Sequence, residues 1–295
     1  MNSAESTSLP LGKETIAYRV ASHPVTLIGA ARAASMQALH PLVIAGVSTY
    51  SSFRSRPLER LRRTGWYVNA TAFGHPDTAA AAAAHVTRMH ARVNGVDPVT
   101  GERYDANDPE QQLYVHLTEW HSFLVAYRTY VRAVSESEAD RMWSEVAPLG
   151  ALLGTPIEMI PTTAAAVREY FATVNAGLRA SPAALETIRF LLSPPPIREL
   201  APFRPAFPVA ARAAIATFPH HARALAGLGD SPGLDALTVA AVRPAVALTM
   251  PLLRRAQRMI AGPQVYAFLE NAPERSGGYV APVELDMVSG LRAAA

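Results

Sequence analysis

The sequence predicts an all-α protein, a single-domain helical bundle of about ten helices, and three features support this prediction. Apolar residues recur at steps of three and four over most of the 295 residues, as they do on helices that face a core. Strand-like alternation of apolar and polar residues is confined to short pieces at most. The hydrophobic fraction of 49% is large enough for a substantial core.

The chain is expected to begin with a flexible N-terminal arm over residues 1–20. A helical pattern starts at His23, and its apolar positions are Leu27, Ile28, Ala31, Ala34 and Leu39. Pro41 ends or kinks this helix, and a further apolar turn follows over residues 42–47.

Proline and turn residues bound the next two helices. Pro57 suits the first turn of a helix that should run to about Phe73. The GHPD sequence that follows is a turn, in which Asp77 or Thr78 should cap an alanine-rich helix. That helix carries His85, Arg88 and His90.

The clearest loop covers residues 93–110, which are dense in Gly, Pro, Asn and Asp. Asp108 and Pro109 should start a long helix over about residues 108–132. Ser135 followed by Glu138 resembles a capping box, which predicts a helix ending near Gly150.

Shorter helices are expected in the C-terminal half. Thr162 or Thr163 should begin a helix to about Leu178, and SPAALETIRFLL should form another short one. Residues 199–262 are rich in Ala and Leu but contain many prolines, so they should form several short helices packed as a lid or scaffold.

The apolar stretch over residues 236–253 is interrupted by Arg243, Pro244 and Pro251. It therefore predicts a buried helix pair rather than a transmembrane segment. The tail after Ala272 should be irregular, and we expect one helical domain over residues 21–265 followed by a C-terminal tail over 266–295.

Composition excludes several classes of function. The net charge of +3 is too small, and the basic residues too dispersed, to indicate nucleic-acid binding. With no cysteine, the chain has no disulfide, zinc–thiolate site or thiolate-ligated haem. Lys13 is the sole lysine, which excludes Schiff-base or P-loop lysine chemistry elsewhere. No export signal is visible, so a cytoplasmic protein is expected.

The first candidate site lies in the expected helix that starts at Pro57. Arg60, Arg63 and Thr64 share one helical patch, because offsets of three and four residues face the same way. His90, on the next helix, has apolar neighbours and could hold a cofactor opposite this patch. A hydrogen-bonded core histidine is the alternative reading of His90.

His116, Glu119 and His121 form a second cluster on the long helix. His116 and Glu119 share a face, and His121 is displaced from both. Together with His90 they could form a non-haem iron or manganese site. The paired Glu-x-x-His pattern of di-iron bundles is absent.

No acidic residue stands between Glu14 and Glu59, a segment that contains Arg19, Arg32, Arg54 and Arg56. Guanidinium groups bind carboxylates of a ligand, such as haem propionates. The absence of acidic residues is explained equally well if this segment forms a buried, apolar helix pair, which would contain few charged side chains.

Three blocks resemble the DUF2236 family, the oxygenase group that includes MpaB and latex clearing protein. They are GARAASMQALHPLVIAGVSTYSSFRSRPLERLRRTGWYV, RMHARV and YVHLTEWHSFL, in that order. The resemblance implies an all-α, latex-clearing-protein-like bundle that encloses haem b. It implies His90 as the iron ligand, Arg60, Arg63 and Thr64 as the distal R-x-x-K-T motif, and His116 near the haem.

Two departures from the family pattern argue against rubber cleavage as the reaction of this chain. Arg63 replaces a lysine that can bind iron, and a guanidinium is a poor iron ligand, so the distal position should be open or hold water. The acid-free segment offers no counterpart for the acidic base of the rubber oxygenase.

The function expected from the resemblance is a haem-dependent oxygenase acting with dioxygen on a small apolar molecule, such as an isoprenoid or other unsaturated compound. The reaction would be oxidative C=C cleavage or hydroxylation. The alternatives are a non-catalytic haem sensor or carrier, and a non-haem metal enzyme using His90, His116, Glu119 and His121.

Overall fold

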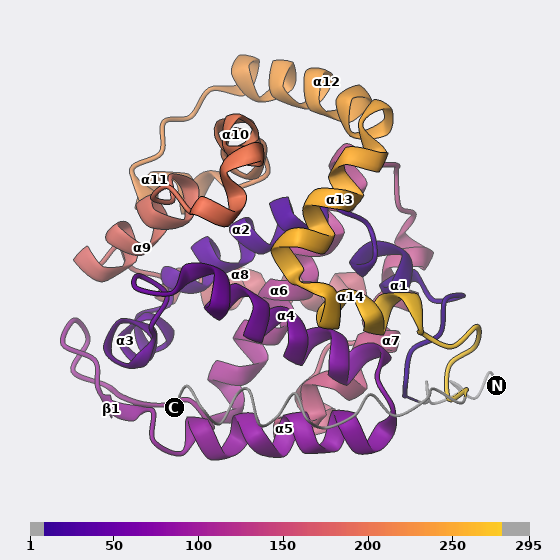
Figure 1. Ribbon diagram of the computed structural model, residues 1–295. Coiled ribbons are helices and arrows are strands. Elements are labelled where there is room, and N and C mark those ends of the chain that lie inside the picture. The colour runs from indigo at the N-terminus through magenta and orange to yellow at the C-terminus, as the bar shows by residue number, and fades with distance from the viewer. Residues whose placement is uncertain (1–8, 279–295) are drawn as a thin grey trace.

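The computed structural model describes residues 9–278, and the all-α prediction is confirmed (Figure 1). The helices of the N-terminal half are α1 (Ile16–Ala21), α2 (Thr26–Ala38), α3 (Pro41–Tyr50), α4 (Pro57–Phe73), α5 (Pro76–His90), α6 (Pro109–Tyr130) and α7 (Glu136–Ala151). Those of the C-terminal half are α8 (Ala164–Val174), α9 (Pro182–Leu192), α10 (Phe207–Ala216), α11 (His220–Ala226), α12 (Pro232–Leu248), α13 (Met250–Ala261) and α14 (Pro263–Glu270). Short 3₁₀ segments cover Ile157–Met159, Asn175–Gly177 and Arg198–Ala206.

The loop between α5 and α6 contains a small antiparallel hairpin of β1 (Asn94–Val96) and β2 (Arg103–Asp105). Gly95 pairs with Tyr104 in its register. A Cβ on Gly95 would lie 2.8 Å from the Tyr104 hydroxyl, so the position favours glycine. The remaining structure is helical, and the hairpin packs against α3.

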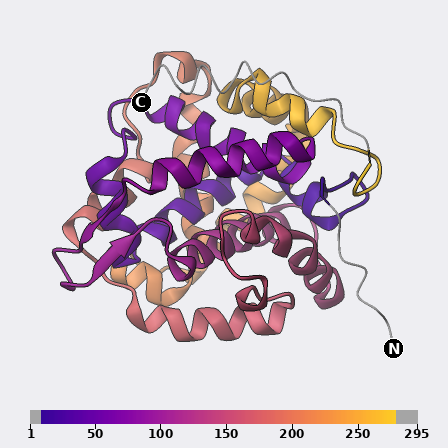
Figure 2. The ribbon, with the colours of Figure 1, turned by 90° about the horizontal axis from the view of Figure 1, so that it is seen from below.

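The long helix α6 runs through the middle of the bundle, with α2 packed along it (Figures 1 and 2). Their backbones approach closely at Gly29, where a Cβ would lie 3.0 Å from the Ser122 carbonyl oxygen and 3.1 Å from Phe123 Cα. The buried face of α2 is therefore Gly29, Arg32, Ala33, Ser35 and Met36. Of the positions expected from apolar periodicity, Leu39 is buried, whereas Leu27, Ile28, Ala31 and Ala34 are only half-buried, because the close contact at Gly29 turns another face of α2 towards α6.

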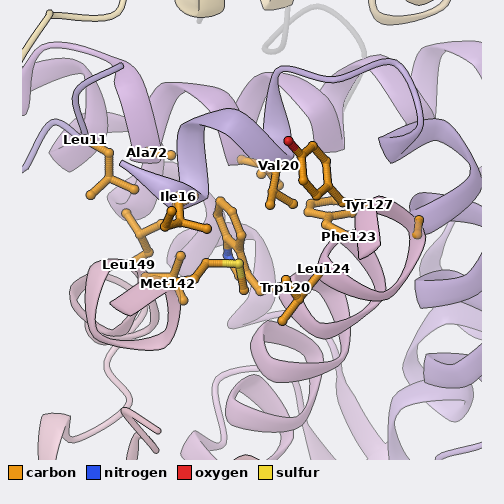
Figure 3. Close-up of a cluster of buried hydrophobic side chains, with 14 of the residues drawn as sticks. Leu11, Ile16, Val20, Ala72, Trp120, Phe123, Leu124, Tyr127, Met142 and Leu149 are labelled. Atoms are coloured by element: carbon orange, nitrogen blue, oxygen red, sulfur yellow. The ribbon is translucent and has the colours of Figure 1, made fainter. Parts of the chain in front are cut away.

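The main core lies where α1, α6 and α7 meet (Figure 3). Ile16 and Val20 of α1 point towards Trp120 of α6 and Met142 of α7 in this cluster. All four side chains are almost fully inaccessible to water. Burial of such apolar area is the largest favourable contribution to folding.

The prediction of a flexible arm over residues 1–20 is wrong for residues 9–20. Leu11, Ile16 and Val20 are buried, and α1 is anchored through the carboxylate of Glu145 on α7. The two Glu145 carboxylate oxygens accept hydrogen bonds from the backbone N–H groups of Ile16 (3.2 Å) and Ala17 (2.9 Å). A remote carboxylate thus satisfies donors that a helix N-terminus leaves open, which cannot be read from local sequence. Residues 1–8 lie outside the described residues.

The expected C-terminal tail also begins inside the folded structure. Val265, Phe268 and Leu269 of α14 are buried in the main core, next to α4. Ala272, after which an irregular tail is predicted, is buried as well. The part of the predicted tail over residues 279–295 lies outside the described residues, and the domain limits 21–265 stay a prediction.

The prediction of a buried helix pair over residues 236–253 is wrong in its burial. α12 and α13 do form a pair, but most of α12 is exposed, including Leu237 and Leu248. Over residues 9–278, no single helix has the length and apolar character needed to cross a membrane. Only α12 and α13 taken together meet that condition, and they are bent by 88° at their junction.

Local capping agrees with the sequence in most places. Ser135 and Glu138 form the expected capping box of α7, and the side chain of Asp108 caps α6. For α5, however, the cap is His75, whose Nδ1 accepts from the backbone N–H of Asp77, rather than Asp77 or Thr78.

Candidate functional site

The face of α4 that looks into the bundle carries a row of polar groups. Arg60, Thr64 and Tyr67 stand at positions i, i+4 and i+7, so they lie one above another. The Arg60 guanidinium donates to the Thr64 hydroxyl, which in turn donates to the Arg60 carbonyl oxygen (3.1 Å). The two side chains of the predicted motif are thus linked.

Glu119 of α6 stands opposite this row. Burial raises its pKa to about 7, and the charge of Arg60 offsets part of that rise. Burial also raises the pKa of Tyr67, and the carboxylate of Glu119 adds to the effect. These effects on pKa show that Arg60, Tyr67 and Glu119 lie close together. With a pKa of about 7, Glu119 can gain or lose a proton near neutral pH.

His90, in the last turn of α5, lies near Arg60. The α4–α5 connection is a tight turn, so the two helices pack antiparallel and the start of α4 meets the end of α5. Burial lowers the pKa of His90, and the nearby charge of Arg60 lowers it further, while the backbone of Ala106 and the charge of Asp105 oppose the shift. The imidazole is therefore neutral at physiological pH, as a metal ligand must be.

One ring nitrogen of His90 is unsatisfied. Its Nδ1 atom is buried and has no hydrogen-bond partner in the described structure. An unpaired buried nitrogen costs about 1–3 kcal/mol, so it indicates a missing partner.

The helices around these residues have different packing partners. α4 packs on α5, α13 and α14, whereas α6 packs on α2, and the backbones of α4 and α6 do not run along each other. Arg60 is exposed by area, although burial lowers its pKa. Both observations hold if the Arg60 side chain lies among neighbouring protein atoms while its end stays in contact with solvent.

Two other predicted site residues have different neighbours. Arg63 forms an ion pair with Glu59 one turn earlier on α4. His116 packs against α7, where a Cβ on Gly150 would lie 3.2 Å from its Cδ2 atom. Burial lowers the pKa of His116 to about 4, and its Nε2 atom is buried without a partner.

His121 lies on nearly the opposite side of α6 from Glu119, because two residues correspond to about 200° of rotation round a helix. Its ring packs on Phe171 at 5.0 Å between centroids. Its Nδ1 atom is 3.5 Å from the Arg32 guanidinium. The structure thus separates His121 from Glu119.

The arginines of the acid-free segment do not form one group. Arg54 pairs with Glu186 at 2.8 Å and Arg56 with Glu59 at 3.6 Å. Arg19 donates to the Glu14 carbonyl oxygen. Only Arg32 is buried, in the cavity beside His121.

The geometry distinguishes between the metal hypotheses. Within residues 9–278 no three His, Asp or Glu side chains converge as a metal site, so the non-haem centre built on His90, His116, Glu119 and His121 is not assembled. A haem needs only one imidazole from the protein. His90, which has a buried unpaired nitrogen and lies near Arg60, fits that requirement.

Sequence reasoning did not single out Tyr67 and gave Glu119 the role of a metal ligand. The signal for Tyr67 was available, because it continues the Arg60–Thr64 row by three residues. The position of Glu119 depends on how α6 crosses α4, which helical periodicity does not encode.

Comparison with known proteins gives one result. A family model described as "ER-bound oxygenase mpaB/B'/Rubber oxygenase, catalytic domain" matches residues 18–255. No curated protein and no solved structure matches the chain significantly.

Proposed function

The chain belongs to the family of MpaB and rubber oxygenase catalytic domains and is an oxygenase; we propose that it uses haem b held by His90. The observation that carries the proposal is the buried, unpartnered Nδ1 atom of His90 beside Arg60. The imidazole ring would offer one nitrogen to iron, while the backbone at Ala106 would hold the other.

When bound, haem iron supplies the site at which dioxygen is activated. The residues of the chain supply charge and protons around that site. Arg60, oriented by its bond to Thr64, presents a fixed positive charge and hydrogen-bond donors to an oxygen species. Arg63, which the resemblance places on the distal side, is engaged by Glu59 and contributes to the charge around Arg60.

Glu119 is the group that can hold or deliver a proton. With a pKa of about 7, one carboxyl oxygen carries a proton in roughly half of the molecules at neutral pH. A general acid or base works best when its pKa is close to the working pH. Glu119 can therefore take the role of the acidic base for which the acid-free segment offers no candidate.

The substrate we propose is a small apolar molecule with an unsaturated bond, such as an isoprenoid, and the reaction is oxidative C=C cleavage or hydroxylation. Arg63 pairs with Glu59 and, as a guanidinium, would not bind iron as a lysine can. The cytoplasmic location stays part of the proposal.

Absorption spectroscopy of the purified protein tests this function. The proposal expects a Soret band, a shift of that band when carbon monoxide is added after reduction, and dioxygen consumption with an unsaturated apolar substrate. A haem sensor or carrier would bind carbon monoxide but consume no dioxygen. A colourless protein that does not bind added haem would contradict the cofactor assignment.

A further inference from the structure

A cavity of about 240 Å³ lies between α2, α6 and α8, on the side of α6 away from Glu119. Its polar lining includes Arg32, Thr118 and His121, with Arg168 and Asn175, and Met36, Phe171 and Pro219 are among its apolar residues. The cavity is smaller than the roughly 300–1,000 Å³ of pockets for drug-sized ligands, so its ligand would be small.

Arg32 is buried in this cavity without an acidic partner. Its side chain is 2% exposed. Nε donates to the Thr217 carbonyl oxygen (3.2 Å) and Nη1 donates to the Ser122 hydroxyl (2.6 Å). In the described structure its other amino group, Nη2, donates no hydrogen bond to the protein.

The charges that act on Arg32 do not neutralise it. Burial lowers its pKa to about 10, and the positive charge of Arg128 lowers it further, while Tyr114 opposes the shift. Arg168 at the cavity is engaged by Glu136 at 2.6 Å. A buried guanidinium normally has a carboxylate partner, because an unpaired buried charge is costly.

Thr118 provides an independent observation. It is 2% exposed, and its buried Oγ1 atom has no hydrogen-bond partner of good geometry, although it lies within reach of the Tyr114 hydroxyl. The ring of His121 is uncharged at neutral pH because burial and the charges of Arg32 and Arg128 all lower its pKa. The cavity therefore combines one buried positive charge without an acidic partner in the described structure, a buried hydroxyl and an apolar wall.

We propose that this cavity binds a small monocarboxylic acid, whose carboxylate pairs with Arg32 and accepts from Thr118 while its apolar body packs on Met36 and Phe171. One guanidinium matches one carboxylate charge, whereas a phosphate dianion would need further donors. The cavity lies on another face of α6 than Glu119, so this proposal does not depend on the proposed function.

Substitutions at His121 give the sharpest test, because they leave Arg32 in place. In His121→Asp the new carboxylate occupies the position near Nδ1, 3.5 Å from the guanidinium, and competes with the ligand. His121→Asn has the same shape without the charge and is the matched control. Arg32→Met removes the charge itself, and Thr118→Val removes the hydroxyl.

The measurement is binding of benzoate to the purified full-length protein by calorimetry, with uncharged benzamide and inorganic phosphate as comparison ligands. We expect benzoate alone to bind, and to bind at least about tenfold more weakly to His121→Asp and Arg32→Met than to the wild type or His121→Asn. Equal binding of benzamide or phosphate, or unchanged benzoate binding to His121→Asp, would overturn the proposal.

A haem propionate is a second source of the same carboxylate. If it occupied Arg32, benzoate would bind the haem-free protein but not the haem-loaded protein, and Arg32→Met would lose haem. We expect benzoate to bind both forms equally and Arg32→Met to retain haem.

Discussion

The charge of Arg60 on α4 stabilises the carboxylate of Glu119 on α6 across the interior of the bundle, without forming an ion pair with it among residues 9–278. Arg60 donates to Thr64 instead. A separated pair of this kind leaves both groups available to a ligand placed between them. The geometry favours a reaction site over a structural ion pair.

Glu119→Gln should change how stability depends on pH. The folded-state pKa of Glu119, about 7, lies above the usual 4.5, so ionisation destabilises the folded protein as pH rises from 4.5 to beyond 7. The glutamine side chain does not ionise, so the free energy of unfolding of the variant should exceed that of the wild type by an amount that grows with pH, to about 3 kcal/mol above pH 7.

Urea unfolding of the haem-free protein at pH 5 and pH 8 measures this advantage. Glu59→Gln is the control, since that carboxylate is partly exposed and paired on α4. An effect of Glu119→Gln that is the same at both pH values would contradict the raised pKa.

Arg60→Met should raise the pKa of Glu119 above 7, because the positive charge of Arg60 lowers that pKa in the wild type. The carboxylic acid C=O band of Glu119, followed by infrared titration, reports the change. Arg63→Met should have a smaller effect, since Glu59 compensates the charge of Arg63. Equal shifts in the two variants would show that Arg60 is not the neighbour of Glu119.

Glu145→Ala should destabilise the protein by about 3 kcal/mol, because two buried backbone donors of α1 lose a charged acceptor. Urea denaturation measures the loss. Glu169→Ala, at an exposed position of α8, is the control and should change the unfolding free energy by less than about 0.5 kcal/mol. Similar losses in both variants would mean that α1 is not held by Glu145.

Gly29→Ala should cost about 1–3 kcal/mol, since its Cβ would lie 3.0 Å from the Ser122 carbonyl oxygen and force α2 away from α6. Gly233→Ala, in the first turn of α12 with open space around its Cα, should be neutral or stabilising by up to about 1 kcal/mol. Thermal unfolding of both variants provides the comparison, and a stabilised Gly29→Ala would contradict the close helix crossing.

The sequence predicted the features that local chemistry determines. α4 has the expected limits because Pro57 opens it and the turn at Gly74 ends it. The Ser135–Glu138 capping box formed because its two hydrogen bonds are local. The Arg60–Thr64 pair follows likewise from helical spacing alone.

Features that depend on contacts between distant segments were not predictable in this way. The burial of α1 depends on Glu145, well over a hundred residues away. The buried face of α2 depends on the close approach of α6 at Gly29. For the same reason Glu119 could be named from its sequence but not placed opposite Arg60 until the crossing of α4 and α6 was known.

The haem content of His90→Ala tests the central assignment most directly. Wild type, His90→Ala and His85→Ala, the control on the same helix, are loaded with haem and compared by absorption spectrum and by bound haem per chain. The account predicts that His90→Ala alone loses most of its haem, and that added imidazole restores binding. Full haem content and an unchanged spectrum in His90→Ala would contradict it.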